Sequence, residues 1–193
     1  PSGCAEVFYH RPTGRMVRGL SPTRDTDVYT SSQFWSSAPL RAYFDYTNLC
    51  NLECTHCITS SSPHADTSKE LPTERVLELI QELAAMGVLE IQMSGGEPLV
   101  HKHWRDILSC VTMSGVNLIL TTNGTRLNDR NLADLVAIKP LEVRVSFDGG
   151  PELHDRIRGE GVYAKALAGA AKLAESGIPT AARFTLVKGG EAE

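Results

Sequence analysis

Two hydrophobic periods alternate along residues 40–190 of the chain. Short runs rich in Val, Leu and Ile are typical of buried strands, whereas apolar positions three and four residues apart are typical of helices. The strand pattern covers residues 41–47, 88–93, 116–121, 141–147 and 181–187. The helical pattern covers residues 73–86, 104–111, 131–137 and 163–175. Asn128 or Asp129 is expected to cap the third helix, because a short polar side chain there can accept a hydrogen bond from the first turn.

Strands that alternate with helices predict an α/β fold, in which right-handed crossovers join parallel strands. Within the first strand, Ala42, Phe44 and Tyr46 are predicted to share a face. The apolar strands are expected to be covered on both faces. Periodicity leaves two architectures open, a closed barrel and an open doubly wound sheet. Both place chemistry at the carboxyl ends of the strands, so candidate functional residues are sought there.

The first 39 residues have a different pattern from the rest. Val7–Tyr9 and Met16–Arg18 flank a segment with Pro and Gly, which predicts a short β-hairpin. A connector rich in Ser, Thr and Pro follows from Ser21 to Pro39. We therefore expect an N-terminal extension over residues 1–39 and a core domain over residues 40–193.

Composition and charge exclude several classes of protein. The chain has 193 residues, 41% of them hydrophobic, which is enough apolar material for a sizeable core. Its net charge is −4 with no basic block, so no nucleic-acid partner is expected. Its apolar runs are too short to cross a bilayer and no signal segment opens it, so we expect a cytoplasmic protein without a membrane partner.

The cysteines suggest a metal centre. Three of the five, Cys50, Cys54 and Cys57, lie within eight residues directly after the first strand, a pattern unlike a secreted disulfide framework. One interpretation is a zinc site with His56 or His64 as the fourth ligand. However, zinc sites usually pair their ligands across a longer stretch, and no second pair exists here. Three cysteines without a fourth fit better a cubane iron–sulfur cluster with one iron left open.

Motifs at the ends of four successive strands carry a family resemblance. The Cys-x3-Cys-x2-Cys spacing, followed in order by Ser94–Pro98 (SGGEP), Thr121–Thr125 (TTNGT) and Val145–Gly149 (VSFDG), resembles the radical S-adenosylmethionine (radical SAM) superfamily. A lone Gly-Gly-Glu is weak, but the ordered set is specific. The resemblance spans roughly residues 40–190 and implies a partial (βα)6-type TIM barrel.

The resemblance implies roles for ten residues. Cys50, Cys54 and Cys57 correspond to the ligands of three irons of a [4Fe–4S] cluster, whose fourth iron is chelated by S-adenosylmethionine. The remaining seven correspond to cofactor-binding positions: His56 near the adenine, Gly95, Gly96 and Glu97 at the methionyl amino group, Ser146 at the ribose or carboxylate, Arg158 at the methionyl carboxylate, and Asn123 at a less defined position. Glycine suits its position because it lets a ligand approach the backbone closely. No side chain is assigned as a catalytic acid, base or nucleophile.

Other polar residues have plain structural interpretations. Asp148 can cap a turn and Arg156 can be a solvated surface charge, although both are weaker site candidates. His101, His103 and His154 could suggest a metal site, but His101 and His103 lie at a helix start and are expected to be surface or packing groups. Cys110 is expected to be a small buried or half-buried residue of the second helix. Cys4 has no partner that the sequence identifies.

The implied activity is reductive cleavage of S-adenosylmethionine to a 5′-deoxyadenosyl radical, which abstracts hydrogen from a substrate. Residues Ser146–Gly159 resemble the SPASM/Twitch-like branch of peptide and cofactor maturases, which predicts a peptide or protein substrate. Residues 166–186 also resemble enzymes that modify side chains of haem or haem d1 tetrapyrroles, which is the alternative and implies a small-molecule substrate. An electron donor such as flavodoxin or ferredoxin is implied. The alternative from another class is a non-enzymatic zinc or iron–sulfur module.

The chain departs from the family pattern in two ways. No cysteine follows Cys110, so this stretch is expected to hold one cluster and no auxiliary ones. The family barrel has six βα units, whereas five strands are counted here, so the barrel is expected to be truncated after strand five. Either the sequence is a piece of a longer protein, or a partner or swapped copy covers the edge of the fifth strand.

Overall fold

The computed structural model describes residues 6–10, 15–19 and 39–185. Strands β1 (Glu6–His10) and β2 (Arg15–Gly19) pair antiparallel with Glu6 opposite Gly19, which confirms the predicted hairpin pairing. Its turn and residues 20–38 of the predicted connector lie outside the described residues. The division into an extension and a core domain stays a prediction.

Five parallel strands form the main sheet, in the order β3-β4-β5-β6-β7. They are β3 (Arg41–Asp45), β4 (Glu90–Ser94), β5 (Asn117–Thr122), β6 (Glu142–Phe147) and β7 (Thr180–Phe184). Spatial order follows chain order without the reversal that marks a doubly wound sheet, so the architecture is of the barrel type. Within the described residues the barrel is not closed, because β3 and β7 do not pair with each other.

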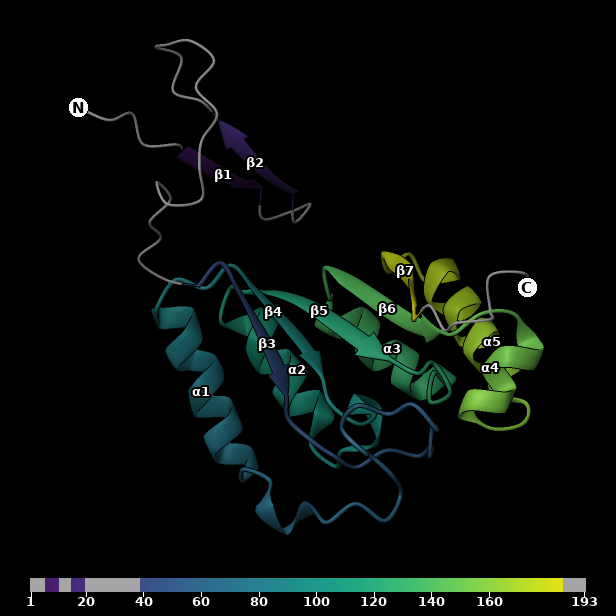
Figure 1. Ribbon diagram of the computed structural model, residues 1–193. Coiled ribbons are helices and arrows are strands. Elements are labelled where there is room, and N and C mark those ends of the chain that lie inside the picture. Colours follow the sequence, from purple (N-terminus) through teal and green to yellow (C-terminus); the bar gives the residue numbers. More distant parts are fainter. Residues whose placement is uncertain (1–5, 11–14, 20–38, 186–193) are drawn as a thin grey trace, which may run out of the picture.

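Helices cover one face of this sheet (Figure 1). They are α1 (Thr73–Ala85), α2 (Trp104–Met113), α3 (Asp129–Ile138) and α5 (Val162–Glu175), whereas α4 (Pro151–Arg158) packs against α5 beyond the carboxyl end of β6. The Asn128 side chain accepts a hydrogen bond from the Asn131 N–H, which confirms one of the two predicted caps of α3. Helix α4 was not predicted: Pro151 stands in its first turn, Gly159 ends it, and its buried apolar residues are only Leu153 and Ile157.

The hydrophobic core lies between the sheet and these helices. Its largest fully buried side chains come from both layers and include Ile80, Ile91, Met93, Ile107, Leu108, Leu118, Leu120, Leu135 and Leu173. Burying each such side chain stabilises the fold by about 1.5–3 kcal/mol. The helix-covered face therefore provides most of the stability, which leaves the opposite face available for function.

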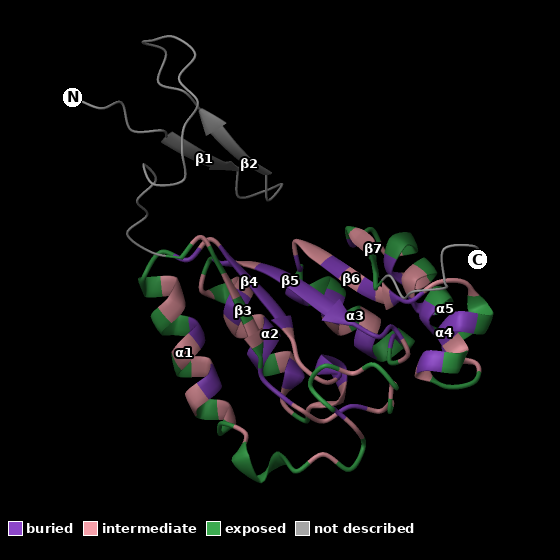
Figure 2. Ribbon diagram, in the orientation of Figure 1, coloured by how far each residue is buried: buried purple, intermediate pink, exposed green. Residues whose placement is uncertain are grey.

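The opposite face of the sheet is polar, so the expectation that every strand is covered on both faces is wrong for the outer strands. On β3, Ala42 and Phe44 are partly buried against the core, as the shared-face prediction required, whereas Tyr43 is 70% exposed. Burial also alternates along β6, and three residues of β7 are exposed. In Figure 2 the fully buried strand segments concentrate on β4 and β5, at the centre of the sheet.

Candidate active site at the carboxyl ends of the strands

The cysteine loop is tied down at both ends to the neighbouring strand connections. Its start is held by the β4 connection, since Gly96 N–H donates to Thr47 O (2.7 Å) and Glu97 N–H donates to Leu49 O (2.9 Å). Its end returns to its start, because Cys50 N–H donates to Ser62 O (3.1 Å). The loop is therefore a closed unit fixed to the carboxyl ends of β3 and β4.

A cavity of about 570 Å³ lies in front of this loop. Nine of the ten site residues predicted from the sequence line it: Cys50, Cys54, His56, Cys57, Gly95, Gly96, Asn123, Ser146 and Arg158. These residues come from the ends of four successive strands and from α4. The structure thus brings together in one place almost the whole set that the family resemblance implied, at the strand ends where functional residues were sought.

The three thiols of the loop are free and differ in their surroundings. Cys50 is buried, which raises the pKa of its thiol to about 11, and Cys54 and Cys57 are half-buried. Burial also raises the pKa of Cys54, although the cation of Arg158 opposes this shift. At Cys57, burial acts in the same direction, but hydrogen bonds from Thr59 and Ser61 outweigh it and lower the pKa. The most exposed end of the loop therefore already stabilises a thiolate.

These thiols fit a cluster better than a single metal ion. Within residues 39–185, no three His, Cys, Asp or Glu side chains converge on a point that one ion could occupy. The two histidines considered as a fourth zinc ligand are engaged or distant from the cavity: His56 Nε2 donates to Asp148, and His64 is exposed and does not line it. A cubane cluster needs no such convergence, because each thiolate binds a different iron. Three free thiols on one loop beside a large cavity match that donor set.

Gly95 and Gly96 are required by the packing of the backbone. A Cβ atom on Gly95 would lie 2.4 Å from Thr47 O, and one on Gly96 would lie 2.2 Å from Leu49 O. Gly95 also has φ +131°, which side-chain-bearing residues rarely adopt. Glycine at these positions therefore lets the β4 connection press against the start of the cysteine loop. Close approach of a ligand, the reason given by the sequence argument, stays a prediction.

Glu97 is the one predicted site residue that does not line the cavity. Its carboxylate is fully buried and accepts from Leu99 N–H (3.1 Å), Thr122 Oγ1 (2.7 Å) and Asn123 N–H (2.7 Å). Burial raises the pKa of this carboxyl group, although the three donors oppose the rise. These contacts connect the end of β4 to the end of β5. Direct binding of a methionyl amino group by Glu97 stays a prediction.

Asn123 connects the end of β5 to the cysteine loop. Its amide nitrogen donates to Asn51 Oδ1 (3.1 Å) and lies 3.9 Å from Cys50 Sγ. Its carbonyl oxygen accepts from Thr125 N–H at 2.9 Å. Both ends of the side chain are therefore engaged, and the residue holds the β5 connection against the first cysteine.

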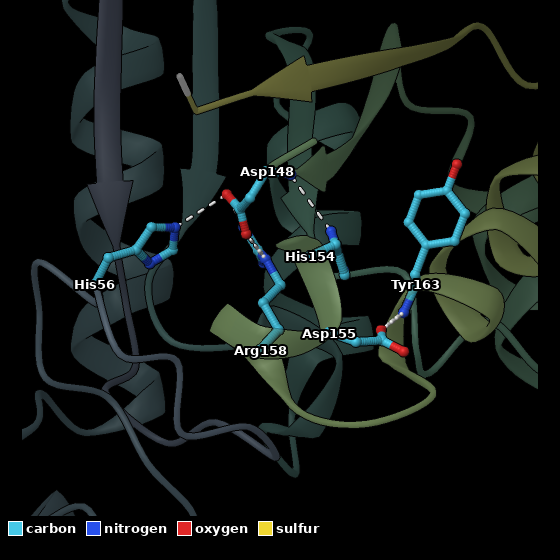
Figure 3. A network of polar contacts seen from close by, with 6 residues as sticks. All are labelled: His56, Asp148, His154, Asp155, Arg158 and Tyr163. Carbon is cyan, nitrogen blue, oxygen red and sulfur yellow. Dashed lines mark hydrogen bonds and ion pairs between the residues drawn. The ribbon is translucent and has the colours of Figure 1, made fainter. Parts of the chain in front are cut away.

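A network of charged residues holds the end of β6 against α4 and the cysteine loop (Figure 3). Asp148 Oδ1 accepts from His56 Nε2 (3.0 Å) and from Arg158 Nη2 (3.1 Å), and Arg158 Nε donates to the other oxygen. Burial alone would raise the pKa of Asp148, but Arg158 and His56 outweigh it and the pKa is lowered. Asp148, which was expected either to cap a turn or to be a weaker site candidate, therefore lies at the centre of this network.

Several residues of the cavity wall, most of them on inward-facing strand positions, were not predicted from the sequence. The same cavity is also lined by Tyr43, Asp45, Gln92, Ser94, Thr121, Arg183 and Thr185. Hydrogen bonds cross this polar face, for example from Arg144 Nη1 to Gln92 Oε1 (3.0 Å). Polar residues at every second position of the strands could have indicated this polar face. They were not used because both faces of the sheet were expected to be covered.

The histidines judged unlikely as ligands lie away from the cavity. His101 packs edge-on against Tyr46, and His103 lies 3.5 Å from Asp106 at the start of α2. His154 is fully buried and packs against Phe147 and Tyr163. Cys110 is half-buried in α2, as expected.

Fold and site together define a barrel-type α/β protein with a three-thiol centre at the carboxyl edge of its sheet. Residues 45–193 match the Radical SAM superfamily, and the chain belongs to this family, whose cofactors are a [4Fe–4S] cluster and S-adenosylmethionine. Within the described residues, no helix is both long and apolar enough to span a membrane.

Similar proteins include enzymes acting on different substrates. The chain is 34% identical over 145 residues to the mycofactocin maturase MftC of Mycobacterium ulcerans, and this alignment covers 75% of the chain and 39% of MftC. It is 34% identical over 146 residues to the Fe-coproporphyrin III synthase of Methanosarcina barkeri, and this alignment covers 75% of the chain and 36% of the synthase. Streptococcus suis SuiB bound to S-adenosylmethionine superposes with a TM-score of 0.67 at 19% identity, over 79% of this chain and 35% of SuiB. The chain thus spans about two fifths of the length of the curated relatives it matches.

Proposed function

We propose that this protein is a radical SAM enzyme that cleaves S-adenosylmethionine reductively and uses the resulting 5′-deoxyadenosyl radical to abstract hydrogen from a substrate. The observation that carries this proposal is the single cavity in which nine of the ten predicted residues meet at the ends of successive strands. When bound, the cluster and S-adenosylmethionine supply the electron transfer and the radical. The chain supplies ligands, orientation and shielding from water.

Each part of the site has a task in this proposal. Cys50, Cys54 and Cys57 bind three irons, and the buried setting of Cys50 limits access of water to that side. Ser146 and Arg158 offer a hydroxyl and a guanidinium toward the cavity, which suit the ribose and carboxylate of S-adenosylmethionine.

We further propose a peptide or protein substrate, modified by the enzyme as a maturase. This reading is supported by relatives named mycofactocin maturase, sporulation killing factor maturation protein and PqqA peptide cyclase. The polar inner face of the sheet, with Gln92 and Arg144 joined across strands, offers hydrogen-bonding groups suited to a peptide. A flavodoxin or ferredoxin is the proposed electron donor, and the cytoplasm the proposed location.

A tetrapyrrole side-chain modifying enzyme is the second candidate. It is favoured by the Fe-coproporphyrin III synthase and by the AdoMet-dependent heme synthase of Methanosarcina barkeri, 33% identical over 155 residues. Incubation with a precursor peptide from the neighbouring genes and, separately, with iron tetrapyrroles that carry carboxylate side chains distinguishes the candidates. Mass spectrometry then shows which of the two substrates changes in mass.

The primary test is anaerobic reconstitution with iron and sulfide, reduction with dithionite, and chromatography for 5′-deoxyadenosine. We expect S-adenosylmethionine to change the EPR signal of the reduced cluster and to be cleaved. Cys54→Ala should abolish both cluster retention and cleavage because it removes one iron ligand, whereas Cys110→Ala, at a half-buried position in α2, should retain both. A colourless zinc protein, or a cluster indifferent to S-adenosylmethionine, would reject the enzyme and support a non-enzymatic module.

A further inference from the structure

We propose that Asp148 is a positioning residue for cofactor binding. It holds one edge of the Arg158 guanidinium so that the other edge is offered to the cavity, and it binds His56 of the cysteine loop with the same carboxylate. This inference deepens the proposed function, because the ligand offered to Arg158 is the carboxylate of S-adenosylmethionine.

The burial of the network makes its geometry rigid. The Asp148 side chain is 0% exposed and that of Arg158 is 10% exposed, whereas that of His56 is 30% exposed. Arg158 Nε and Nη2 grip the two oxygens of Asp148 side by side, which is the bidentate arrangement that fixes a guanidinium plane. Asp148 is in turn fixed through its backbone, since its N–H donates to His154 Nδ1 at 3.3 Å. Arg158 therefore has one preferred orientation before any ligand binds.

The donors of Arg158 that Asp148 leaves unused are the ones relevant to a ligand. A guanidinium has five N–H donors, and Asp148 occupies one on Nε and one on Nη2. Among the described residues, no acceptor binds Nη1, and Arg158 lines the cavity. The free edge formed by Nη1 and Nη2 is itself a fork that fits a carboxylate. Without Asp148, this long side chain would have to order itself at the moment of binding, which weakens affinity.

The same carboxylate also connects the cofactor site to the cysteine loop. His56 lies between Cys54 and Cys57, and the adjacent Thr55 N–H donates to Ile157 O of α4 at 3.0 Å. Two consecutive loop residues are therefore attached to Asp148 and α4. Because Asp148 binds both Arg158 and His56, it sets the position of the guanidinium relative to the thiols. An ion pair that joined only residues of α4 would not have this effect.

A double-mutant cycle tests this inference on the reconstituted full chain. The variants are Asp148→Asn, Arg158→Lys and both together, and the readout is the dissociation constant for S-adenosylmethionine from titration of the EPR signal of the reduced cluster. We expect each single variant to weaken binding by about tenfold or more, because each removes the oriented fork. The double variant should bind no more weakly than the worse single variant, because both changes remove the same interaction.

Asp155→Asn is the matched control. Asp155 also lies beside this network in α4 and also accepts two hydrogen bonds, from Gly161 N–H and Tyr163 N–H (both 2.7 Å), but it does not line the cavity (Figure 3). Its replacement should lower the melting temperature and leave the affinity within about twofold of the wild type, since its contacts stay within the α4–α5 connection. Iron content is measured for every variant, so that lost affinity is separated from a lost cluster.

Several results would overturn the inference. Wild-type affinity in Asp148→Asn, or additive losses in the double variant, would show that Asp148 does not act through Arg158. If Asp148→Asn fails to fold or to hold iron, Arg158→Lys decides, because it keeps the charge beside Asp148 and loses only the fork; wild-type affinity in that variant rejects the inference. If the wild type itself binds no S-adenosylmethionine, the proposed function fails instead.

Discussion

Glu97 and Asp148 are two buried carboxylates at the carboxyl ends of strands of the same sheet, but their environments are opposite. Glu97 follows β4 and accepts from two backbone N–H groups and a hydroxyl, all neutral donors. Asp148 follows β6 and accepts from a guanidinium and an imidazole. Burial consequently raises the pKa of Glu97, whereas the hydrogen bonds from Arg158 and His56 lower the pKa of Asp148 despite burial.

The difference separates two tasks at one edge of the sheet. Three neutral donors bind Glu97, and through them this residue joins the ends of β4 and β5. Asp148 uses its charge to compensate and orient a cation that does line the cavity. The charge of the hydrogen-bond donors, and not burial alone, therefore distinguishes the two carboxylates.

Replacing Asp148 by alanine should have the largest effect on stability. The change leaves the Arg158 cation buried without its partner, which costs about 3–5 kcal/mol of the free energy of unfolding. Urea unfolding of the cluster-free protein, followed by circular dichroism, measures this loss. A loss below about 1 kcal/mol would mean that water solvates Arg158 as it does a surface charge, and the contrast with Glu97 would disappear.

Glu97→Gln should have the next largest effect. Both carboxylate oxygens accept a backbone N–H, one from Leu99 and one from Asn123. The amide group of glutamine has only one oxygen, so one buried N–H is left facing another donor in either orientation. We expect a loss of about 1–3 kcal/mol in the same unfolding measurement. An unchanged free energy of unfolding would show that the amide finds other partners and that Glu97 does not join the strands.

The pH dependence of stability should run in opposite directions for the two groups. The lowered pKa of Asp148 contributes stability above its unfolded value, near 3.8, which is lost as the pH falls through the folded value. The raised pKa of Glu97 contributes stability below its unfolded value, near 4.5, which is lost as the pH rises through the folded value.

Unfolding of the cluster-free protein between pH 3 and pH 7 tests these signs. The stability difference between the wild type and Asp148→Asn should shrink in acid, whereas that between the wild type and Glu97→Gln should shrink as the pH rises. Neither slope should exceed about 1.4 kcal/mol per pH unit, the limit for one proton. Slopes of the same sign would contradict the opposite environments assigned to the two groups.

The sequence predicted the neighbourhood of the site because parallel strands collect their carboxyl ends at one edge. Ser146 and Asn123, which the family resemblance identified, were therefore expected near the cysteines. It did not predict helix α4, because only Leu153 and Ile157 give it an apolar pattern. Without α4, the pairing of Arg158 with Asp148 was invisible, since it depends on how a helix turns its side chains toward a strand end. Likewise, the polar inner face was missed, although β4 carries Glu90, Gln92 and Ser94 in alternation with its apolar residues.

Asp129→Asn should have the smallest effect and isolates the part played by burial. Like Asp148, Asp129 accepts from a cation, Lys172 Nζ at 2.7 Å, which lowers the pKa of its carboxyl group. Unlike Asp148, it is 93% exposed, and Lys172 is 44% exposed, so water and salt replace the lost interaction. We expect a melting temperature indistinguishable from the wild type at 0.15 M salt, checked by scanning calorimetry beside Asp148→Ala. A comparable fall in both variants would show that a nearby cation alone, and not its removal from water, gives Asp148 its importance.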